Sequence, residues 1–192
     1  MPPDPKANLA MPTRPAVIET PRLRLIALLP GELRALVARA SGSVSTLLGV
    51  HVPYAFPSDP DARAGLSWHL QALSREPAQV AWRLRVAVER SQGAVLGSIN
   101  LKGPPDVHGD VEIGWGIEPI HRQQGYALEA ASAVLEWASR QRDVLTVSAT
   151  IAVHNTASQR LAARLGMRLT QDLRRGLPLW MYRSTPTAAH TA

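Results

Sequence analysis

One stretch of the chain, residues 111–127, constrains the fold more than any other. It begins as an apolar strand interrupted by Gly114 and Gly116, continues as a short polar turn, and ends in a helix that starts at Tyr126. The helix is predicted to reach Ser139, because small and apolar residues recur along it with the spacing of one helical face. Glycine weakens a strand unless a bulge or a close approach to the main chain requires it. The two glycines therefore indicate that a ligand approaches this strand.

The turn before this helix predicts an anion-binding site. Gly125 and Ala127 keep the side chains small at the helix entrance. The first-turn N–H groups of a helix lack intrahelical partners, and the helix dipole favours negative charge there. Because small residues let a phosphate approach the main chain closely, we interpret residues 122–127 as a pyrophosphate-binding segment, called the cradle below.

Composition narrows the possible chemistry. The chain has 192 residues, which suits one domain, and no cysteine, which excludes disulfides, thiolate metal sites and a cysteine nucleophile. The histidines lack metal-ligand spacing, so we expect no metal. Although 21 Lys and Arg oppose 15 Asp and Glu, the basic residues are scattered, and no nucleic-acid surface is expected. Without a segment long enough to cross a bilayer, we expect no membrane association and a cytoplasmic location.

The order of predicted elements describes one domain over residues 17–184, with flexible tails at residues 1–16 and 185–192. Period-two alternation, turn signals and helical stripes predict the elements in order. They are a strand at 17–27, helices at 32–40 and 62–75, a hairpin at 80–88 and 94–101, a strand at 109–117, the helix at 126–139, a strand at 144–153, a helix capped by Asn155 and ending at Leu165, and strands at 168–173 and 179–183.

Three separated segments resemble the GCN5-related N-acetyltransferases (GNAT), and in particular the branch of bacterial ribosomal-protein N-terminal (Rim-type) acetyltransferases. Residues 19–25 are similar to the opening strand of that branch. The cradle, followed by Glu129-Ala130, matches the family's R/Q-x-x-G-x-G/A signature. Residues 155–158 match its Asn-x-x-Ser pattern, and residues 165–167 match its Leu-Gly-Phe ending with Met in place of Phe. The three segments occur in the family's order, and the resemblance covers residues 18–183.

The resemblance implies an α+β fold of three layers. Its sheet is mixed and mostly antiparallel, with six or seven strands, a parallel splay between the two central strands, and helices on both faces. It also implies acetyl-CoA as cosubstrate and an amine as acceptor. The acceptor is either a protein N-terminus or a small molecule such as an amino acid, polyamine or antibiotic. A monomer and a homodimer are both compatible with it.

The resemblance assigns cosubstrate contacts to three places. The main chain of residues 115–118 pairs with pantetheine, and an N–H near Ile117 polarises the thioester carbonyl. The cradle binds pyrophosphate, and Asn155 contacts pantetheine or the acceptor while also capping its helix. The implied cosubstrate-binding residues are Trp115, Gly116, Ile117, Glu118, Arg122, Gln123, Gln124, Gly125, Tyr126, Ala127, Asn155 and Ser158.

Direct attack of the amine on the thioester is the simplest reaction for a chain without cysteine. Glu112 is a candidate base for the amine, and an exposed or arginine-paired carboxylate is the alternative. Many relatives protonate the departing thiolate with a tyrosine where this chain has Ala162. Ser158 is therefore the candidate acid or thiol partner, with helix capping as its alternative role. A catalytically silent acyl-CoA-binding module also fits the missing tyrosine.

Overall fold

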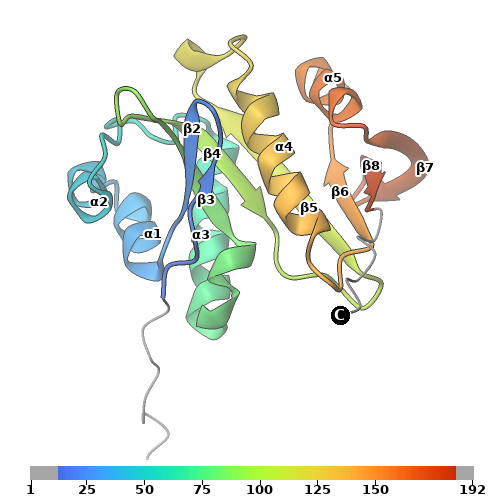
Figure 1. Ribbon diagram of the computed structural model, residues 1–192, viewed down its shortest axis with the longest axis horizontal. Helices are drawn as coiled ribbons and strands as arrows, with labels where there is room; N and C mark the ends of the chain where they lie inside the picture. The colour runs from blue at the N-terminus through green and yellow to red at the C-terminus, as the bar shows by residue number, and fades with distance from the viewer. Residues whose placement is uncertain (1–12, 185–192) are drawn as a thin grey trace, which may run out of the picture.

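In the computed structural model, which describes residues 13–184, eight strands form one sheet with helices on both faces (Figure 1). The strands are β1 (Ile18–Glu19), β2 (Leu23–Ala27), β3 (Leu84–Glu89), β4 (Val95–Leu101), β5 (Asp110–Ile117), β6 (Thr146–Thr150), β7 (Arg168–Arg174) and β8 (Leu177–Arg183). The helices are α1 (Pro30–Val37), α2 (Ser41–Leu48), α3 (Pro60–Arg75), α4 (Tyr126–Ser139) and α5 (Thr156–Arg164), with 3-10 turns η1 (Pro77–Trp82) and η2 (Pro119–His121). Residues 1–12 and 185–192 of the two predicted tails lie outside the described part.

The strand order is β1-β2-β3-β4-β5-β6-β8-β7, and β5 with β6 is the parallel pair. This confirms the predicted mixed, mostly antiparallel sheet. The sheet has one strand more than the upper predicted count of seven, because the expected opening strand at 17–27 is divided into β1 and β2. A turn separates them, in which the Thr20 N–H donates to the Leu23 carbonyl at 2.9 Å. Pro21 lies in that turn and has no N–H to donate to a ladder.

The sheet separates two apolar layers. On one face, α4 and α5 cover a core that includes Val111, Ile113 and Val147. On the other face, α1, α2 and α3 cover a core built on β2, β3 and β4. Figure 1 shows α4 in front of the sheet and α3 behind it. Successive side chains alternate between faces, so Glu112 points to the α3 face whereas its neighbours Val111 and Ile113 point to the α4 face.

The parallel splay is confirmed by the register of β5. It pairs with β6 only through Asp110, Val111 and Glu112. On its other side it stays paired with β4 as far as Ile117. From Ile113 onward β5 and β6 therefore diverge, and an opening forms between the two central strands.

The predicted boundaries of an element were correct where a long series of apolar residues with helical spacing determined them. Helix α4 spans the predicted residues, and Asn155 caps α5 as expected. The first half of the strand predicted at 80–88 was wrong, because residues 77–82 form η1 and β3 begins at Leu84. Pro77 fixes the backbone torsion that a helical turn needs, and the Gln79 N–H donates to the Glu76 carbonyl at 3.1 Å.

Candidate functional site

The cradle is a main-chain surface at the start of α4. Gly125 is the N-cap and has a left-handed backbone with φ of 82°, and no side chain caps the first turn. Gln123 is also left-handed, with φ of 62°. Residues 122–125 are exposed. The first-turn N–H groups of α4 are therefore presented to solvent, in the arrangement that binds anions.

Arg22 braces the cradle from the turn between β1 and β2. Its Nε donates to Glu129 Oε2 at 2.6 Å, and its Nη1 donates to the Gln124 carbonyl at 3.0 Å. The guanidinium also lies 4.4 Å from the centre of the Tyr126 ring. Thr20 Oγ1 donates to the other Glu129 oxygen at 2.6 Å. The sequence analysis did not identify this brace, although both partners lie in segments that carry the family resemblance.

The splayed half of β5 directs main-chain groups into the opening. The Glu112 carbonyl accepts from the Lys102 N–H at 2.8 Å, and the Glu118 N–H donates to the Leu96 carbonyl at 2.9 Å, both toward β4. Because main-chain groups alternate along a strand, those of Trp115 and Ile117 face the opposite side, where β6 has moved away. The Ile117 carbonyl accepts from Arg122 Nε at 2.9 Å, which ties the strand end to the cradle.

The two glycines of β5 have different surroundings on the α3 face. A Cβ at Gly114 would lie 3.0 Å from the amide atoms of Asn100, so a larger residue would crowd that side chain. A Cβ at Gly116 would meet no heavy atom within 4 Å. The α3 face of β5 is therefore open beside the splay.

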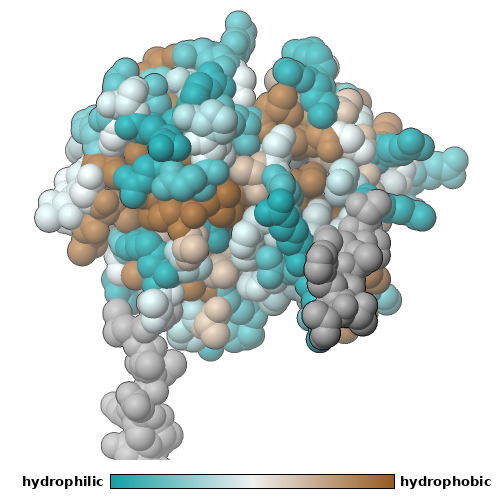
Figure 2. All heavy atoms as spheres, in the orientation of Figure 1, coloured by the Kyte–Doolittle hydropathy of each residue, from teal (hydrophilic) through white to brown (hydrophobic). Residues whose placement is uncertain are grey.

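The start of α5 reaches the other side of the opening. Trp115 Nε1 donates to Ser158 Oγ at 3.3 Å. The Ser158 N–H donates to Asn155 Oδ1 at 3.0 Å, which confirms that Asn155 caps the helix. Figure 2 shows a notch in the molecular surface between the loop before α4 and α5. Three predicted site residues, Trp115, Asn155 and Ser158, therefore come together at this opening, with the cradle on its opposite side.

Glu112 lies on the opposite face of the sheet, within a set of positive charges. Its carboxylate accepts from Lys102, from Arg175 Nη2 at 2.6 Å and from Thr150 Oγ1 at 2.8 Å. Arg174 adds a longer contact at 3.5 Å and pairs with Asp110 at 2.9 Å. Burial alone raises the pKa of Glu112, but the hydrogen bonds from Lys102, Arg175 and Thr150 outweigh it and lower the pKa to about 2.

A carboxylate with so low a pKa is a weak base. These contacts therefore favour the ion-paired role for Glu112 over the role of proton acceptor. The sequence analysis missed its partners, because Arg174 and Arg175 lie about 60 residues further along the chain, in the β7–β8 hairpin. Their adjacent positions in a predicted turn gave no indication of which strand they contact.

The described part of the chain, residues 13–184, contains no group of three or more His, Asp or Glu side chains that could hold a metal ion. It also contains no helix long and apolar enough to span a membrane.

The comparison with known families agrees with this geometry. A family model described as an acetyltransferase (GNAT) domain matches residues 22–168. The chain belongs to this family. The matched region includes the Arg22 brace, the splayed strand, the cradle and the start of α5. Asn155 and Ser158 also lie within it.

Three similar proteins show how far the likeness extends. YjdG, an uncharacterized N-acetyltransferase of Bacillus subtilis (strain 168), is 31% identical over 81 residues, which are 42% of this chain and 48% of that protein. The chain thus spans about half the length of this relative. An acetyltransferase structure from Agrobacterium tumefaciens str. C58 has a TM-score of 0.62 at 22% identity, over 93% of this chain and 99% of that one. The CoA complex of RimL, a ribosomal L7/L12 alpha-N-protein acetyltransferase, has a TM-score of 0.58 at 14% identity, over 88% and 98%. At the low identities of these two structures, the likeness establishes a shared fold alone.

Proposed function

We propose that this protein is an N-acetyltransferase that moves an acetyl group from acetyl-CoA to a primary amine by direct attack. The observation that carries the proposal is the opening between β5 and β6. It is bordered by the main-chain groups of Trp115 and Ile117, by the uncapped start of α4 and by Ser158. A long ligand with a phosphate-rich end and a reactive end fits this arrangement.

Acetyl-CoA supplies an activated thioester, and the chain's own residues bind and orient it. The main-chain N–H groups of the cradle and the dipole of α4 hold the pyrophosphate. Of the segment 115–118, the main-chain groups of Trp115 and Ile117 face the opening and pair with pantetheine, whereas the Glu118 N–H is already bound to the Leu96 carbonyl. The Ile117 N–H donates to the thioester carbonyl and stabilises the negative charge that develops on its oxygen during attack.

Ser158 is our candidate donor to the departing thiolate. A serine hydroxyl has one proton to donate and two lone pairs that accept. Since Ser158 Oγ accepts from Trp115 Nε1, its own proton remains available for a group in the opening. Its main-chain N–H is the group that Asn155 binds, so capping and catalysis use different atoms of the residue.

For Glu112 we propose an electrostatic role on the acceptor side. Its carboxylate fixes Lys102 and Arg175 on the α3 face of β5. An amine proton could pass to Glu112 only after an incoming ammonium displaced one of these cations. We therefore propose that solvent removes the amine proton, while Glu112 positions the charged side chains around the acceptor.

The acceptor that we propose is a protein N-terminal amine, on the basis of the resemblance of residues 19–25 and 155–158 to the Rim-type branch. The test is the release of free CoA from acetyl-CoA with four acceptors: a peptide with a free N-terminus, the same peptide with a blocked N-terminus, a free amino acid and a polyamine. We expect release with the free peptide and none with the blocked one. Release with only a small amine would overturn the choice of acceptor. CoA binding with no release on any acceptor would identify a silent binding module.

A further inference from the structure

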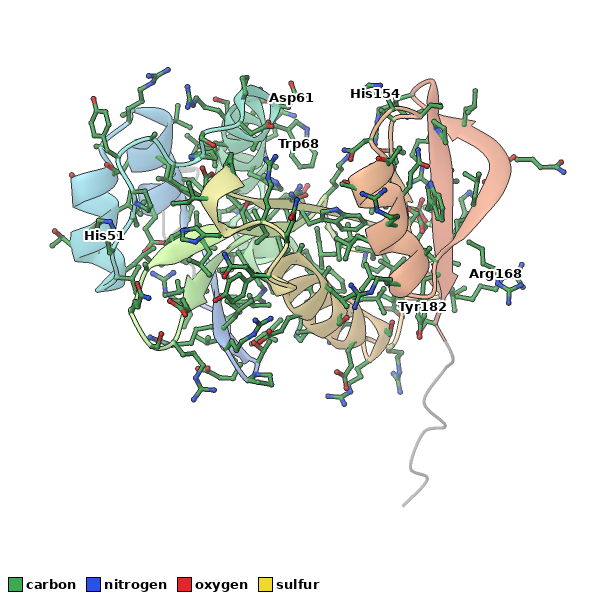
Figure 3. The ribbon with its side chains drawn as sticks, turned by 90° about the horizontal axis from the view of Figure 1, so that it is seen from above. His51, Asp61, Trp68, His154, Arg168 and Tyr182 are labelled. Atoms are coloured by element: carbon green, nitrogen blue, oxygen red, sulfur yellow. The ribbon has the colours of Figure 1, made fainter. Side chains whose placement is uncertain are left out.

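A second hollow lies on the α3 face, beside the Glu112 ion pairs. It is a cavity of about 230 Å³ between α3 and the strands, called the α3 pocket below. The residues that line it are Trp68, Gln71, Ala72, Arg75, Glu76, Arg83 and Lys102. Seen from above in Figure 3, Trp68 projects from α3 toward the half of the molecule that carries His154. The pocket lies on the same face of the sheet as Glu112, whose carboxylate contacts the pocket residue Lys102.

The lining of the α3 pocket is suited to an anion. It has three cationic side chains, Arg75, Arg83 and Lys102, and one carboxylate, Glu76. Glu76 accepts a hydrogen bond from Gln79 Nε2. Within residues 13–184, Arg75 forms no salt bridge with a carboxylate. The unbalanced positive charge leaves the pocket attractive to a carboxylate.

Arg83 adds a second observation that points to a ligand. The residue is only 7% exposed, and its Nε has no hydrogen-bond partner among the described residues. Its other nitrogens donate to the Gln79 side chain and, at 2.9 Å, to the Lys102 carbonyl. Its guanidinium lies 5.1 Å from the centre of the Trp68 ring. Arg83 has no carboxylate within salt-bridge distance among residues 13–184, although Glu76 lines the same pocket. A buried guanidinium with so little compensation is costly, and an anion in the pocket would offset that cost.

Lys102 connects the α3 pocket with the reaction site. Its side chain lines the pocket, and its ammonium contacts Glu112. Glu112 and Gly116 lie on the same face of β5, four residues apart, and the face is open at Gly116. Four residues of strand span about 13 Å. A ligand that reaches from the opening beside Gly116 to the pocket must therefore bridge about that distance.

We propose that the acceptor is a polypeptide N-terminus with an acidic side chain at about its third or fourth residue. Its amine lies at the opening beside Gly116, and its carboxylate enters the α3 pocket between Arg75 and Lys102. An extended peptide advances about 3.3 Å per residue, so its third or fourth residue reaches this distance, whereas the carboxylate of a free amino acid does not. This proposal rests on the proposed function and narrows its acceptor.

Two hexapeptides that differ only in charge test the preference. One is Ser-Ala-Asp-Asp-Ala-Ala and the other is Ser-Ala-Asn-Asn-Ala-Ala, both with amidated C-termini. We expect kcat/KM to be at least about 10-fold higher for the acidic peptide, mainly through a lower KM, and the ratio to fall as salt screens the pocket. Arg75→Gln should bring the ratio close to 1, because kcat/KM for the acidic peptide falls toward the value for the Asn peptide. Arg34→Gln, which removes the same charge from the exposed face of α1, should keep the ratio.

The possible failures are distinguishable. Equal kcat/KM for the two peptides, or a preference for free amino acids, would overturn the acidic-peptide proposal and leave the acetyltransferase intact. Calorimetric titration of the N-acetylated acidic peptide into the CoA-loaded protein measures binding without turnover. Tighter binding of this peptide than of its Asn counterpart, with loss of the difference in Arg75→Gln, supports the pocket even if no peptide is acetylated. The absence of acetylation with every peptide would instead count against the proposed function.

Discussion

At the scale of single residues, Ser158 allows capping to be separated from catalysis. In Ser158→Ala the main-chain N–H that Asn155 binds remains, and only the hydroxyl is lost. We expect kcat to fall by about 10- to 100-fold, since the departing thiolate loses its proton donor, while KM for acetyl-CoA changes by less than about twofold. Thr156→Ala, which removes a hydroxyl from the same helical turn, should keep kcat within about twofold of the unchanged protein. Steady-state kinetics of both variants measure this, and an unchanged kcat in Ser158→Ala would remove the assignment.

Glu112 provides a contrasting case, in which charge is expected to matter more than proton transfer. Glu112→Gln leaves Lys102 and Arg175 without their carboxylate, and we expect the free energy of unfolding at pH 7 to fall by about 1–3 kcal/mol. Because both cations are partly exposed, water moderates the loss. The ascending, acid-side limb of the pH–rate profile should keep its midpoint, because the pKa of a general base would set that limb. Urea unfolding and a pH series of kcat/KM measure the two effects, and a displaced ascending limb would restore Glu112 as the base.

At the scale of elements, the cradle depends on a contact between the β1–β2 turn, where the matched region begins, and the start of α4. Arg22→Gln removes the guanidinium bonds to Glu129 Oε2 and to the Gln124 carbonyl, while the Thr20 hydroxyl still donates to Glu129 Oε1. We expect the Kd for CoA to rise by about 5- to 20-fold, because the loop that presents the N–H groups loses its support. Arg24→Gln is the matched control, since Arg24 is on β2 and its recorded ion pair is a 3.6 Å contact with Glu19. Calorimetric CoA titrations should show a change in the first variant only.

The same elements show what the sequence could and could not predict. The start and end of α4 depend on residues close together in the chain, so spacing and turn chemistry were sufficient to predict them. The split between β1 and β2 was missed, because alternation continues across Pro21 and only the Thr20 turn interrupts it. The partners of Glu112 and Glu129 were missed for a different reason. They lie far away in sequence, and side-chain pairing over such distances depends on the order of strands in the sheet.

At the scale of the whole molecule, the sheet divides the proposed reaction between its two faces. The cradle and Ser158 belong to elements that pack on the α4 face, whereas Glu112, Lys102 and the α3 pocket lie on the α3 face. The splay joins the two faces where β5 leaves β6. Direct attack needs such a passage, because cosubstrate and acceptor must meet while each keeps its own binding surface. We therefore expect the positive charge on the α3 face to affect the choice of acceptor without changing the cosubstrate site.

Two groups on the α3 face, His69 and Glu112, also determine how the protein responds to acid. His69 on α3 is 3% exposed, and burial, followed by the charges of Arg83 and Lys102, lowers its pKa from 6.5 to about 3. The unfolded chain takes up this proton below pH 6.5 and the folded chain does not. The free energy of unfolding therefore falls as the pH drops through 6.5 and stops falling from this cause near pH 3. The effect is about 2 kcal/mol at pH 5.

Glu112 acts in a lower pH range. Its pKa is lowered from 4.5 to about 2, so its contribution is complete above pH 4.5 and is lost as the pH falls toward 2. Between pH 6.5 and 4.5, only His69 of these two groups changes protonation on unfolding. We expect His69→Phe to flatten the decline of stability in that upper range, and Glu112→Gln to leave it unchanged. Urea unfolding at pH 8, 6.5, 5.5 and 5 measures the slopes. An equal slope in His69→Phe and the unchanged protein would contradict the prediction, because it would show that His69 takes up its proton equally in the folded and unfolded chain.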